Sequence, residues 1–473
     1  ENSAFWAHDK KAQFNDEMDN IKKIHPGFFA IDYNNYYFDH ARDLENVLMA
    51  LEDAGRVVVT ETPSFVPALH SRERLGLRLE QGGEAKPFQP AVMAILDPDA
   101  KGDWGHFLAY DRRLGQAAGA TGLSFNIIGR TDLAESARPE GVEALLRVFT
   151  RHSWVLGNKW PATQADDLTA FAFEVDEALL QLESAHIDRD ILLFMYCGSV
   201  EVADVLEHVL IAHPRVRAVI NLFWSYNFEI GTAQYQDHWR SLVTRLARQT
   251  GQVRIMHSTP QIATEFKAAW DVAIPVLPHP STTFGDETAQ SLAARPTRVL
   301  PSDRQPRILF PGGARREKGY YLAVEACAQL AADQAYDLRL RARLDGAEPA
   351  MRQAVADLPT DQVVLDCEDY GEAAFVDWLA SADVLVVPYL PEAFSNRTSG
   401  MLVDAMLLGI PVVVIRDTWL ADELSYSGAG VAVAPTAEAI AAGVRQVLAG
   451  YPRRADATRR AAASYLEGSL WSG

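Results

Sequence analysis

Cationic side chains and glycines cluster at two places in the second half of the chain. The run 311–319 reads Pro-Gly-Gly-Ala-Arg-Arg-Glu-Lys-Gly and directly precedes an expected helix. The run 396–400, Asn-Arg-Thr-Ser-Gly, places Arg397 beside a second expected helix start. Backbone N–H groups at helix starts bind anions, and Arg and Lys bind phosphate through charge-assisted hydrogen bonds. The two clusters together indicate a diphosphate site.

Asp404 lies four residues after Gly400 and is the only charged residue between Met401 and Leu408. The spacing puts it on the same helix face as Gly400, one turn inside the helix. A carboxylate in an otherwise apolar helix is costly unless it is paired. Two interpretations follow: a sugar hydroxyl bound at Asp404, or an internal partner such as an Arg or the end of another element. The neighbouring diphosphate signals favour the sugar.

The elements around these clusters predict a parallel sheet. Val384 to Val387 and Val412 to Ile415 are short, rich in β-branched residues and wholly apolar, as is typical of strands covered on both faces. Strands and helices alternate through both halves of the chain. In the first half we expect strands at 91–96, 123–128, 191–196, 218–223, 253–256 and 272–276, and helices that include 139–150 and 166–182.

This alternation predicts an α/β protein with two doubly wound, Rossmann-like lobes and a cleft at their strand ends. Five segments are expected: an N-terminal helical extension and loop (1–89), a first lobe (90–278), a linker (279–306), a second lobe that contains both cation clusters (307–450) and a C-terminal helix (451–473).

Composition narrows the functional classes. The net charge of −19 argues against a nucleic-acid partner. No long uncharged apolar run or signal-peptide pattern is present, and Cys197, Cys327 and Cys367 are few and without zinc spacing, so we expect a cytoplasmic protein with reduced thiols. The pairs Asp97/Asp99 and Asp188/Asp190 match an Asp-x-Asp metal pattern. We nevertheless expect no metal or other cofactor, because the cations at the phosphates would supply the charge.

The segments 308–319 and 382–414 resemble the GT-B glycosyltransferases, most closely the retaining, nucleotide-sugar-dependent family 4 (glycosyl transferases group 1). The resemblance implies that Asp404 binds the ribose, that the helix start at Thr398, Ser399 and Gly400 holds the diphosphate, and that Arg316 and Lys318 neutralise the leaving phosphate. The family usually has Glu at the positions of Asn396 and Asp404. It often has a first-lobe His near the anomeric carbon, for which His106 is the candidate.

The residue hypotheses are as follows. Taken alone, His106 is better interpreted as a helix-start histidine than as an active-site residue, and Gly105 alone is weak evidence. The catalytic candidates are Arg316, Lys318 and His106. The donor-binding candidates are Gly105, Gly313, Arg315, Asn396, Arg397, Thr398, Ser399, Gly400 and Asp404. The acceptor-side candidates are Trp104, Ser225, Tyr226, Asn227 and His257.

These residues favour transfer of a sugar from a nucleoside diphosphate sugar to a glycan, glycolipid or small-molecule acceptor, with retention, for example in polysaccharide biosynthesis. A nucleotide-sugar epimerase on the same fold and a catalytically weak scaffold subunit are the alternatives. The C-terminal helix contains Arg453, Arg454, Arg459 and Arg460. We expect it to dock on the first lobe, with peripheral membrane contact as the alternative. The sequence does not predict an oligomeric state.

Overall fold

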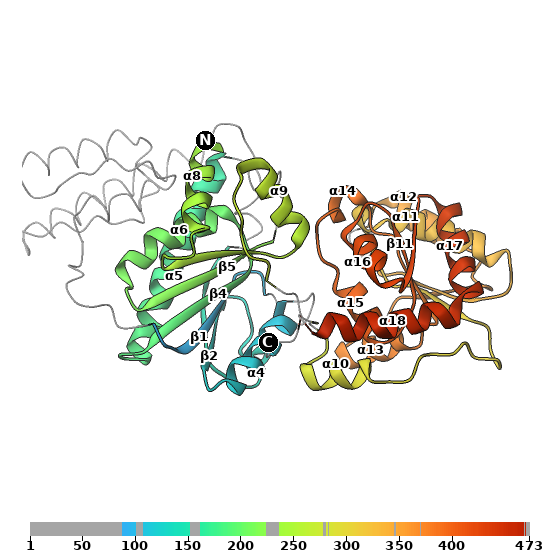
Figure 1. The fold of residues 1–473 in the computed structure, drawn as a ribbon, viewed down its shortest axis with the longest axis horizontal. Helices are drawn as coiled ribbons and strands as arrows, with labels where there is room; N and C mark the ends of the chain where they lie inside the picture. The colour runs from blue at the N-terminus through green and yellow to red at the C-terminus, as the bar shows by residue number, and fades with distance from the viewer. Residues whose placement is uncertain are drawn as a thin grey trace, which may run out of the picture.

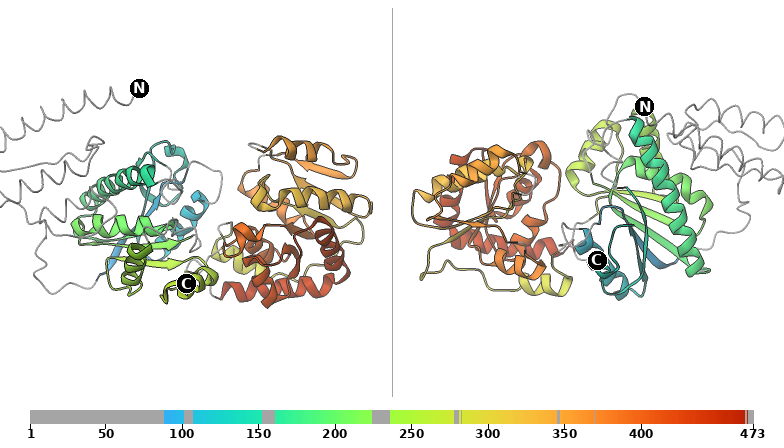
Figure 2. Two further views of the ribbon diagram at one scale, coloured as in Figure 1. Left: turned by 90° about the horizontal axis from the view of Figure 1, so that it is seen from above. Right: turned by 180° about the vertical axis from the view of Figure 1, so that it is seen from behind.

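The chain folds into two lobes that lie side by side, each built on one parallel sheet (Figure 1, Figure 2). The computed structural model describes residues 88–100, 107–151, 161–223, 236–277, 281, 283–344, 347–368, 370–467 and 469. Nearly all of the predicted N-terminal extension, 1–87, lies outside the described residues. No helix in the described ranges is long and apolar enough to cross a membrane.

The first lobe contains a six-stranded sheet in the order β3-β2-β1-β4-β5-β6. Its strands are β1 (Pro90–Asp97), β2 (Ser124–Arg130), β3 (Val142–Phe149), β4 (Asp190–Gly198), β5 (Val216–Leu222) and β6 (Val253–His257). Its helices are α4 (Phe107–Ala120), α5 (Pro161–Ala185), α6 (Val200–Val209), α8 (Gln236–Leu246) and α9 (Pro260–Trp270), with short 3-10 turns at Glu135–Ala137 and Leu210–Ala212.

The second lobe repeats this topology in the order β12-β11-β10-β7-β8-β9. Its strands are β7 (Arg307–Phe310), β8 (Asp337–Arg341), β9 (Val363–Asp366), β10 (Val384–Val387), β11 (Val412–Ile415) and β12 (Gly430–Val433). Its helices are α11 (Tyr320–Ala331), α12 (Pro349–Ala356), α13 (Glu372–Ala380), α14 (Pro391–Phe394), α15 (Gly400–Leu407), α16 (Trp419–Ser427) and α17 (Ala437–Ala449), with a 3-10 turn, η5, at Arg316–Lys318. The predicted two-lobe fold is confirmed.

Each sheet is covered on both faces, which explains the continuously apolar strands. In β1, Ala94 and Leu96 belong to the core cluster on one face, while Met93 and Ile95 belong to the cluster on the other. Successive side chains of a strand point to opposite faces, so a strand between two helix layers needs apolar residues at every position. β10 and β11 are buried along their whole length for the same reason.

Two predictions of secondary structure in the first lobe are wrong. Residues 139–150, expected as a helix, form strand β3 at Val142–Phe149, which pairs in parallel with β2. The run is short and apolar enough for either structure, and pairing with the sheet edge decides it. Residues 272–276, expected as a strand, contribute only an isolated bridge between Val276 and His257.

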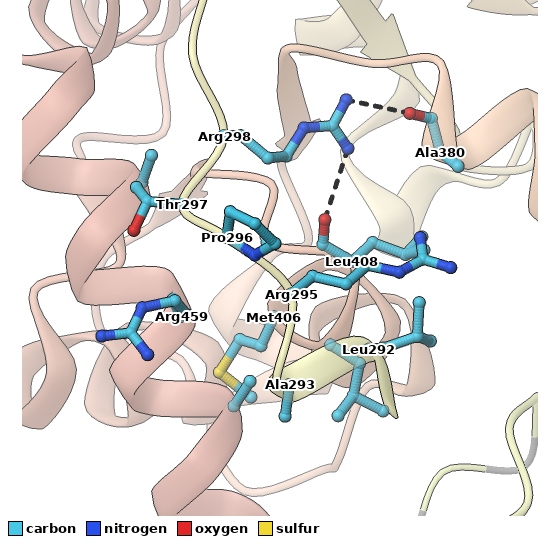
Figure 3. A pocket seen from close by; sticks show the side chains of 14 residues that line it. Leu292, Ala293, Arg295, Pro296, Thr297, Arg298, Ala380, Met406, Leu408 and Arg459 are labelled. Carbon is cyan, nitrogen blue, oxygen red and sulfur yellow. Dashed lines mark hydrogen bonds between the residues drawn. The ribbon is translucent and has the colours of Figure 1, made fainter. Parts of the chain in front are cut away.

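The predicted linker, 279–306, contains helix α10 (Asp286–Ala293) and then a stretch fastened by one arginine. Arg298 donates hydrogen bonds to the carbonyl oxygens of Leu408 (3.3 Å) and Ala380 (3.0 Å), beside a cavity of about 270 Å³ (Figure 3). These carbonyls belong to the carboxyl ends of α15 and α13, where a cation is favourable. Arg298 therefore fastens the linker to the second lobe.

The C-terminal helix, α18 (Tyr451–Leu466), runs along the second lobe, where Figure 1 shows it below α15 and α16. It packs against α15 and α10, and its Ala461, Ala462 and Leu466 belong to the core cluster of that lobe. We expected it to dock on the first lobe. Small alanines allow close approach to α15 instead, and only the carboxyl end of α18 comes near the first lobe, beside Ser258 and Leu277.

Candidate active site

The turn 311–319 connects β7 to α11 and is held rigidly by its last glycine. Gly319 has a φ of 64°, a left-handed conformation that favours glycine. A Cβ at this position would lie 1.8 Å from the carbonyl oxygen of Pro388. The N–H of Leu390 also donates to the carbonyl oxygen of Glu317 (3.0 Å). The turn is therefore fixed against the segment that follows β10.

The three cations of this turn remain accessible. Arg315 and Arg316 are exposed, and Arg315 forms an ion pair with Glu317 at 3.3 Å. Within the described part of the chain, Arg316 has no ion-pair partner. The Lys318 Nζ lies 5.3 Å from the ring centroid of Tyr389, which orients the side chain by a cation–π contact. Arg316 and Lys318 can therefore bind an anion without breaking an internal salt bridge.

Gly313 leaves open space beside the same turn. A Cβ built there would have no heavy atom within 4 Å, whereas one on Gly312 would lie 3.7 Å from the Tyr389 ring. A ligand can thus approach the backbone at Gly313.

Helix α15 provides the second part of the predicted diphosphate site. Ser399 is its N-cap residue, yet its side chain makes no capping hydrogen bond. Its Oγ is buried and has no hydrogen-bond partner in the described ranges. Gly400 begins the helix, so its amide and the next one point outward from a positive helix end. A hydroxyl and backbone N–H groups are therefore present together where an anion is favourable.

Arg397 extends from the second lobe to the first. Its guanidinium carbon lies 5.1 Å from the Phe394 ring centroid and 5.9 Å from that of Phe223, which follows β5. Burial lowers the pKa of Arg397, and the charge of Arg315 lowers it further, while Cys197 at the end of β4 opposes the shift. The arginine remains a cation, because the reference pKa of arginine is far above neutral. The cation cluster thus faces the carboxyl ends of the first-lobe strands.

Asn396 binds the first lobe through both its side chain and its backbone. Its Nδ2 donates to Glu265 Oε1 (2.6 Å) in α9, and its carbonyl oxygen accepts from Thr259 Oγ1 (2.7 Å). A further contact between the lobes joins Gln261 Nε2 to Asp422 Oδ2 (2.9 Å). The side-chain amide of Asn396 therefore has a partner in the first lobe, and its role in donor binding stays a prediction.

Asp404 is 5% exposed and accepts two hydrogen bonds from the linker. Ser281 Oγ donates to its Oδ1 (3.1 Å), and Thr283 Oγ1 donates to its Oδ2 (2.7 Å). These hydroxyls are the internal partners that the sequence left unidentified. The ribose role of Asp404 stays a prediction, and ribose hydroxyls would have to share this carboxylate with Ser281 and Thr283.

Of the acceptor-side candidates, His257 is the one that lies in the described ranges. His257 is fully buried at the end of β6, with its ring centroid 4.6 Å from that of Phe266, and burial lowers its pKa to about 3. The imidazole is therefore neutral and points into the core. The candidates Trp104, Gly105, His106, Ser225, Tyr226 and Asn227 lie outside the described residues.

A buried carboxyl pair at the end of β1 is the feature that the sequence did not reveal. Burial and the nearby Asp99 raise the pKa of Asp97 to about 7, and burial and Asp97 raise the pKa of Asp111 well above its usual range. Each buried carboxyl therefore opposes ionisation of the other. The Asp97/Asp99 pattern was visible in the sequence, but the tertiary fold adds Asp111 from α4. Among the described residues no group of three or more His, Cys, Asp or Glu side chains is arranged to hold a metal ion.

The comparisons with known proteins agree with this geometry. Residues 305–450 match the family model described as glycosyl transferases group 1. This span contains both cation clusters, the start of α15 and Asp404. The second lobe is a glycosyl transferases group 1 domain. Among curated proteins, none has a significantly similar sequence.

Solved structures show that the whole two-lobed arrangement around this group 1 domain is of the GT-B type. A glycosyltransferase from Rickettsia africae is 11% identical, with a TM-score of 0.58, over 81% of this chain and 95% of that chain. An alpha,alpha-trehalose-phosphate synthase (UDP-forming) from Burkholderia vietnamiensis is 13% identical, with a TM-score of 0.55, over 81% and 94%. Sucrose-phosphate synthase from Thermosynechococcus elongatus is 17% identical, with a TM-score of 0.53, over 80% and 95%.

Proposed function

We propose that the protein transfers a sugar from a nucleoside diphosphate sugar to a hydroxyl-bearing acceptor, a glycan, a glycolipid or a small molecule, with retention at the anomeric carbon. The observation behind the proposal is that Arg316, Lys318 and the start of α15 all lie at strand carboxyl ends of a group 1 domain. In doubly wound sheets, ligands bind at that edge. The UDP-forming synthase with the same fold supports a nucleotide-linked donor.

The residues have distinct roles in this proposal. Charge builds up on the leaving phosphate as the sugar separates, and preorganised cations stabilise that charge. Arg316 and Lys318 are the accessible donors for the phosphates, and Gly313 allows a close approach to the backbone. Ser399 Oγ and the amides at the start of α15 hold the second phosphate. Lobe closure around the donor excludes water and limits its hydrolysis.

One observation favours a second candidate function, a binding or scaffold subunit with weak activity. Asn396, where the family pattern has a Glu, hydrogen-bonds Glu265, and Asp404 hydrogen-bonds the linker. The family resemblance implies that these two positions contact the donor sugar and the ribose. If both are committed to internal contacts, the donor is held mainly by its diphosphate.

A screen of nucleotide sugars by mass spectrometry tests these alternatives. UDP-, GDP- and ADP-sugars are incubated with the protein, with and without hydroxyl-bearing acceptors. A glycosylated acceptor supports the transferase, and a changed sugar without any acceptor supports an epimerase. Binding of nucleoside diphosphates without turnover supports the scaffold, and absence of both binding and turnover contradicts the donor site itself. Lys318→Ala is the matched variant, since it removes one cation of the donor turn.

A further inference from the structure

A second cavity, of about 470 Å³, lies where both lobes meet the C-terminal helix. Its volume is in the range of small-molecule binding pockets. Its described lining comes from Ser258, Pro260, Val276 and Leu277 of the first lobe, from Thr398, Met406, Trp419, Glu423 and Ser427 of the second lobe, and from Arg460, Ala461, Ser464, Tyr465 and Ser469 at the chain's end. None of these residues belongs to the donor turn 311–319. Thr398 is the one described lining residue that was also predicted to bind the donor, so the cavity adjoins the predicted diphosphate site without including Arg315, Arg316, Lys318 or Arg397.

The lining is rich in hydroxyl groups. Of the fourteen described residues that line it, six are Ser, Thr or Tyr. Ser258 is only 6% exposed, and its Oγ has no hydrogen-bond partner in the described ranges. A buried hydroxyl without a partner costs free energy, which a ligand can recover by hydrogen bonding to it. Ser258 thus points to a polar ligand rather than to an empty apolar void.

The charges around the cavity disfavour an anionic ligand. Within this described lining, Glu423 is the single carboxylate and Arg460 the single cation. Arg460 is an exposed residue that already forms an ion pair with Asp456. Burial, with the charge of Asp422, raises the pKa of Glu423, and the neighbouring Tyr465 phenol is neutral because burial raises its pKa as well. A phosphate bound here would have little positive charge nearby to offset the free-energy cost of its burial.

We propose that this cavity binds an uncharged, polyhydroxylated molecule the size of a monosaccharide or disaccharide. Ser258, Ser464 and Tyr465 offer hydroxyl partners, and Glu423 accepts from a ligand hydroxyl. Trp419, Met406 and Leu277 provide an apolar wall for the carbon face of a sugar ring. Because both lobes contribute to the walls, a bound ligand stabilises the arrangement in which the two lobes are in contact. The proposal does not depend on glycosyl transfer.

Binding of neutral sugars to the full chain tests the proposal. Glucose and maltose are the probes, observed by saturation-transfer NMR and by thermal shift without any nucleotide. We expect binding with a Kd of about 1 mM or tighter. Ser464→Trp places a large side chain at an exposed lining position and abolishes the binding. Ala463→Trp, at the adjacent exposed position that does not line the cavity, is the matched control and retains it.

The outcomes separate this proposal from the donor site. No saturable binding of either probe, or equal binding by Ser464→Trp and Ala463→Trp, overturns it. If Ser464→Trp does not fold, Ser258→Ala replaces it and weakens binding by the loss of one hydroxyl partner. The Arg316→Ala variant is expected to bind glucose and maltose as the wild type does, even if its affinity for nucleotides is lower. Failure of the donor-site proposal can therefore be distinguished from failure of the cavity proposal. Glycosylation of a bound probe on addition of donors identifies the cavity as an acceptor site, and an altered rate without glycosylation identifies it as an effector site.

Discussion

The side-chain amide of Asn396 donates a hydrogen bond to the carboxylate of Glu265, across the two lobes, at 2.6 Å. The same residue accepts a hydrogen bond from Thr259 through its backbone. An amide can donate to a carboxylate, but a second carboxylate cannot unless one of the two is protonated. The choice of Asn at this position is therefore matched to the Glu that faces it.

Asn396→Glu is expected to lower the melting temperature and to loosen the contact between the lobes. It places two carboxylates together, and like charges at such a distance oppose ionisation of both. Glu265→Gln in the same chain restores an amide–carboxylate pair with the roles reversed. A double-mutant cycle on thermal unfolding should give a coupling of about 0.5–3 kcal/mol. Additive effects of the two changes contradict the pairing.

Arg316→Ala and Lys318→Ala are each expected to weaken nucleoside diphosphate binding by about 10- to 150-fold. This range corresponds to about 1.5–3 kcal/mol for the loss of one charge-assisted hydrogen bond. Titration calorimetry with UDP, GDP and ADP measures it. Arg445→Ala is the control, since Arg445 pairs with Asp333 on the surface of the same lobe. Wild-type affinity in both donor-turn variants removes the diphosphate assignment.

Asp404→Ala is expected to destabilise the protein even without ligand, because the hydroxyls of Ser281 and Thr283 lose their acceptor. The expected loss is about 1–3 kcal/mol in free energy of unfolding for each hydroxyl left unsatisfied. Asp404→Asn keeps one acceptor oxygen and should lose less. Asp357→Ala, at an exposed carboxylate of the same lobe, is the control for charge removal.

The ribose role of Asp404 has its own readout. If the carboxylate also binds the ribose, Asp404→Asn weakens nucleoside diphosphate binding more than pyrophosphate binding. Equal losses for the two ligands show that Asp404 only fastens the linker.

The carboxyl pair Asp97 and Asp111 is expected to make stability fall as pH rises. The folded-state pKa of Asp97 is about 7, against 3.8 for the model carboxyl, so the folded state binds more protons between these values. Stability is then fully present below pH 4 and is lost as pH rises toward and through 7, by at most about 1.4 kcal/mol per pH unit for each proton.

Asp111→Asn removes the partner charge and should flatten this dependence. Melting temperatures are measured from pH 4 to pH 8, and the wild-type value is subtracted from the variant value at each pH. The subtraction removes the contribution of His213, whose raised pKa also makes stability fall as pH rises. Glu140→Gln, at an exposed carboxylate of the same lobe, is the control. A pH dependence unchanged in Asp111→Asn contradicts the electrostatic coupling of the two carboxyls.

Transfer is expected to proceed in excess EDTA at an unchanged rate. Arg316 and Lys318 supply positive charge at the phosphates, where a divalent cation would be repelled by them. The assay compares EDTA-treated protein with and without added magnesium or manganese. Activity that disappears in EDTA and returns with metal refutes this mechanism and directs attention to Asp97 and Asp99.

The sequence alone predicted the two-lobed fold, which is confirmed, and it located the turn 311–319, whose donor role stays a prediction. Both predictions depend on local patterns. Unbroken apolar runs such as Val384–Val387 require burial on both faces, and a Gly-rich turn with three cations before a helix offers an anion site built from adjacent residues. Short apolar runs are ambiguous, so 139–150 became strand β3 only by pairing with the sheet edge. The partners of Asn396, Asp404 and Asp97 are 131, 121–123 and 14 residues away. Those pairings depend on which surfaces the packed lobes bring together, and only the tertiary structure decides them.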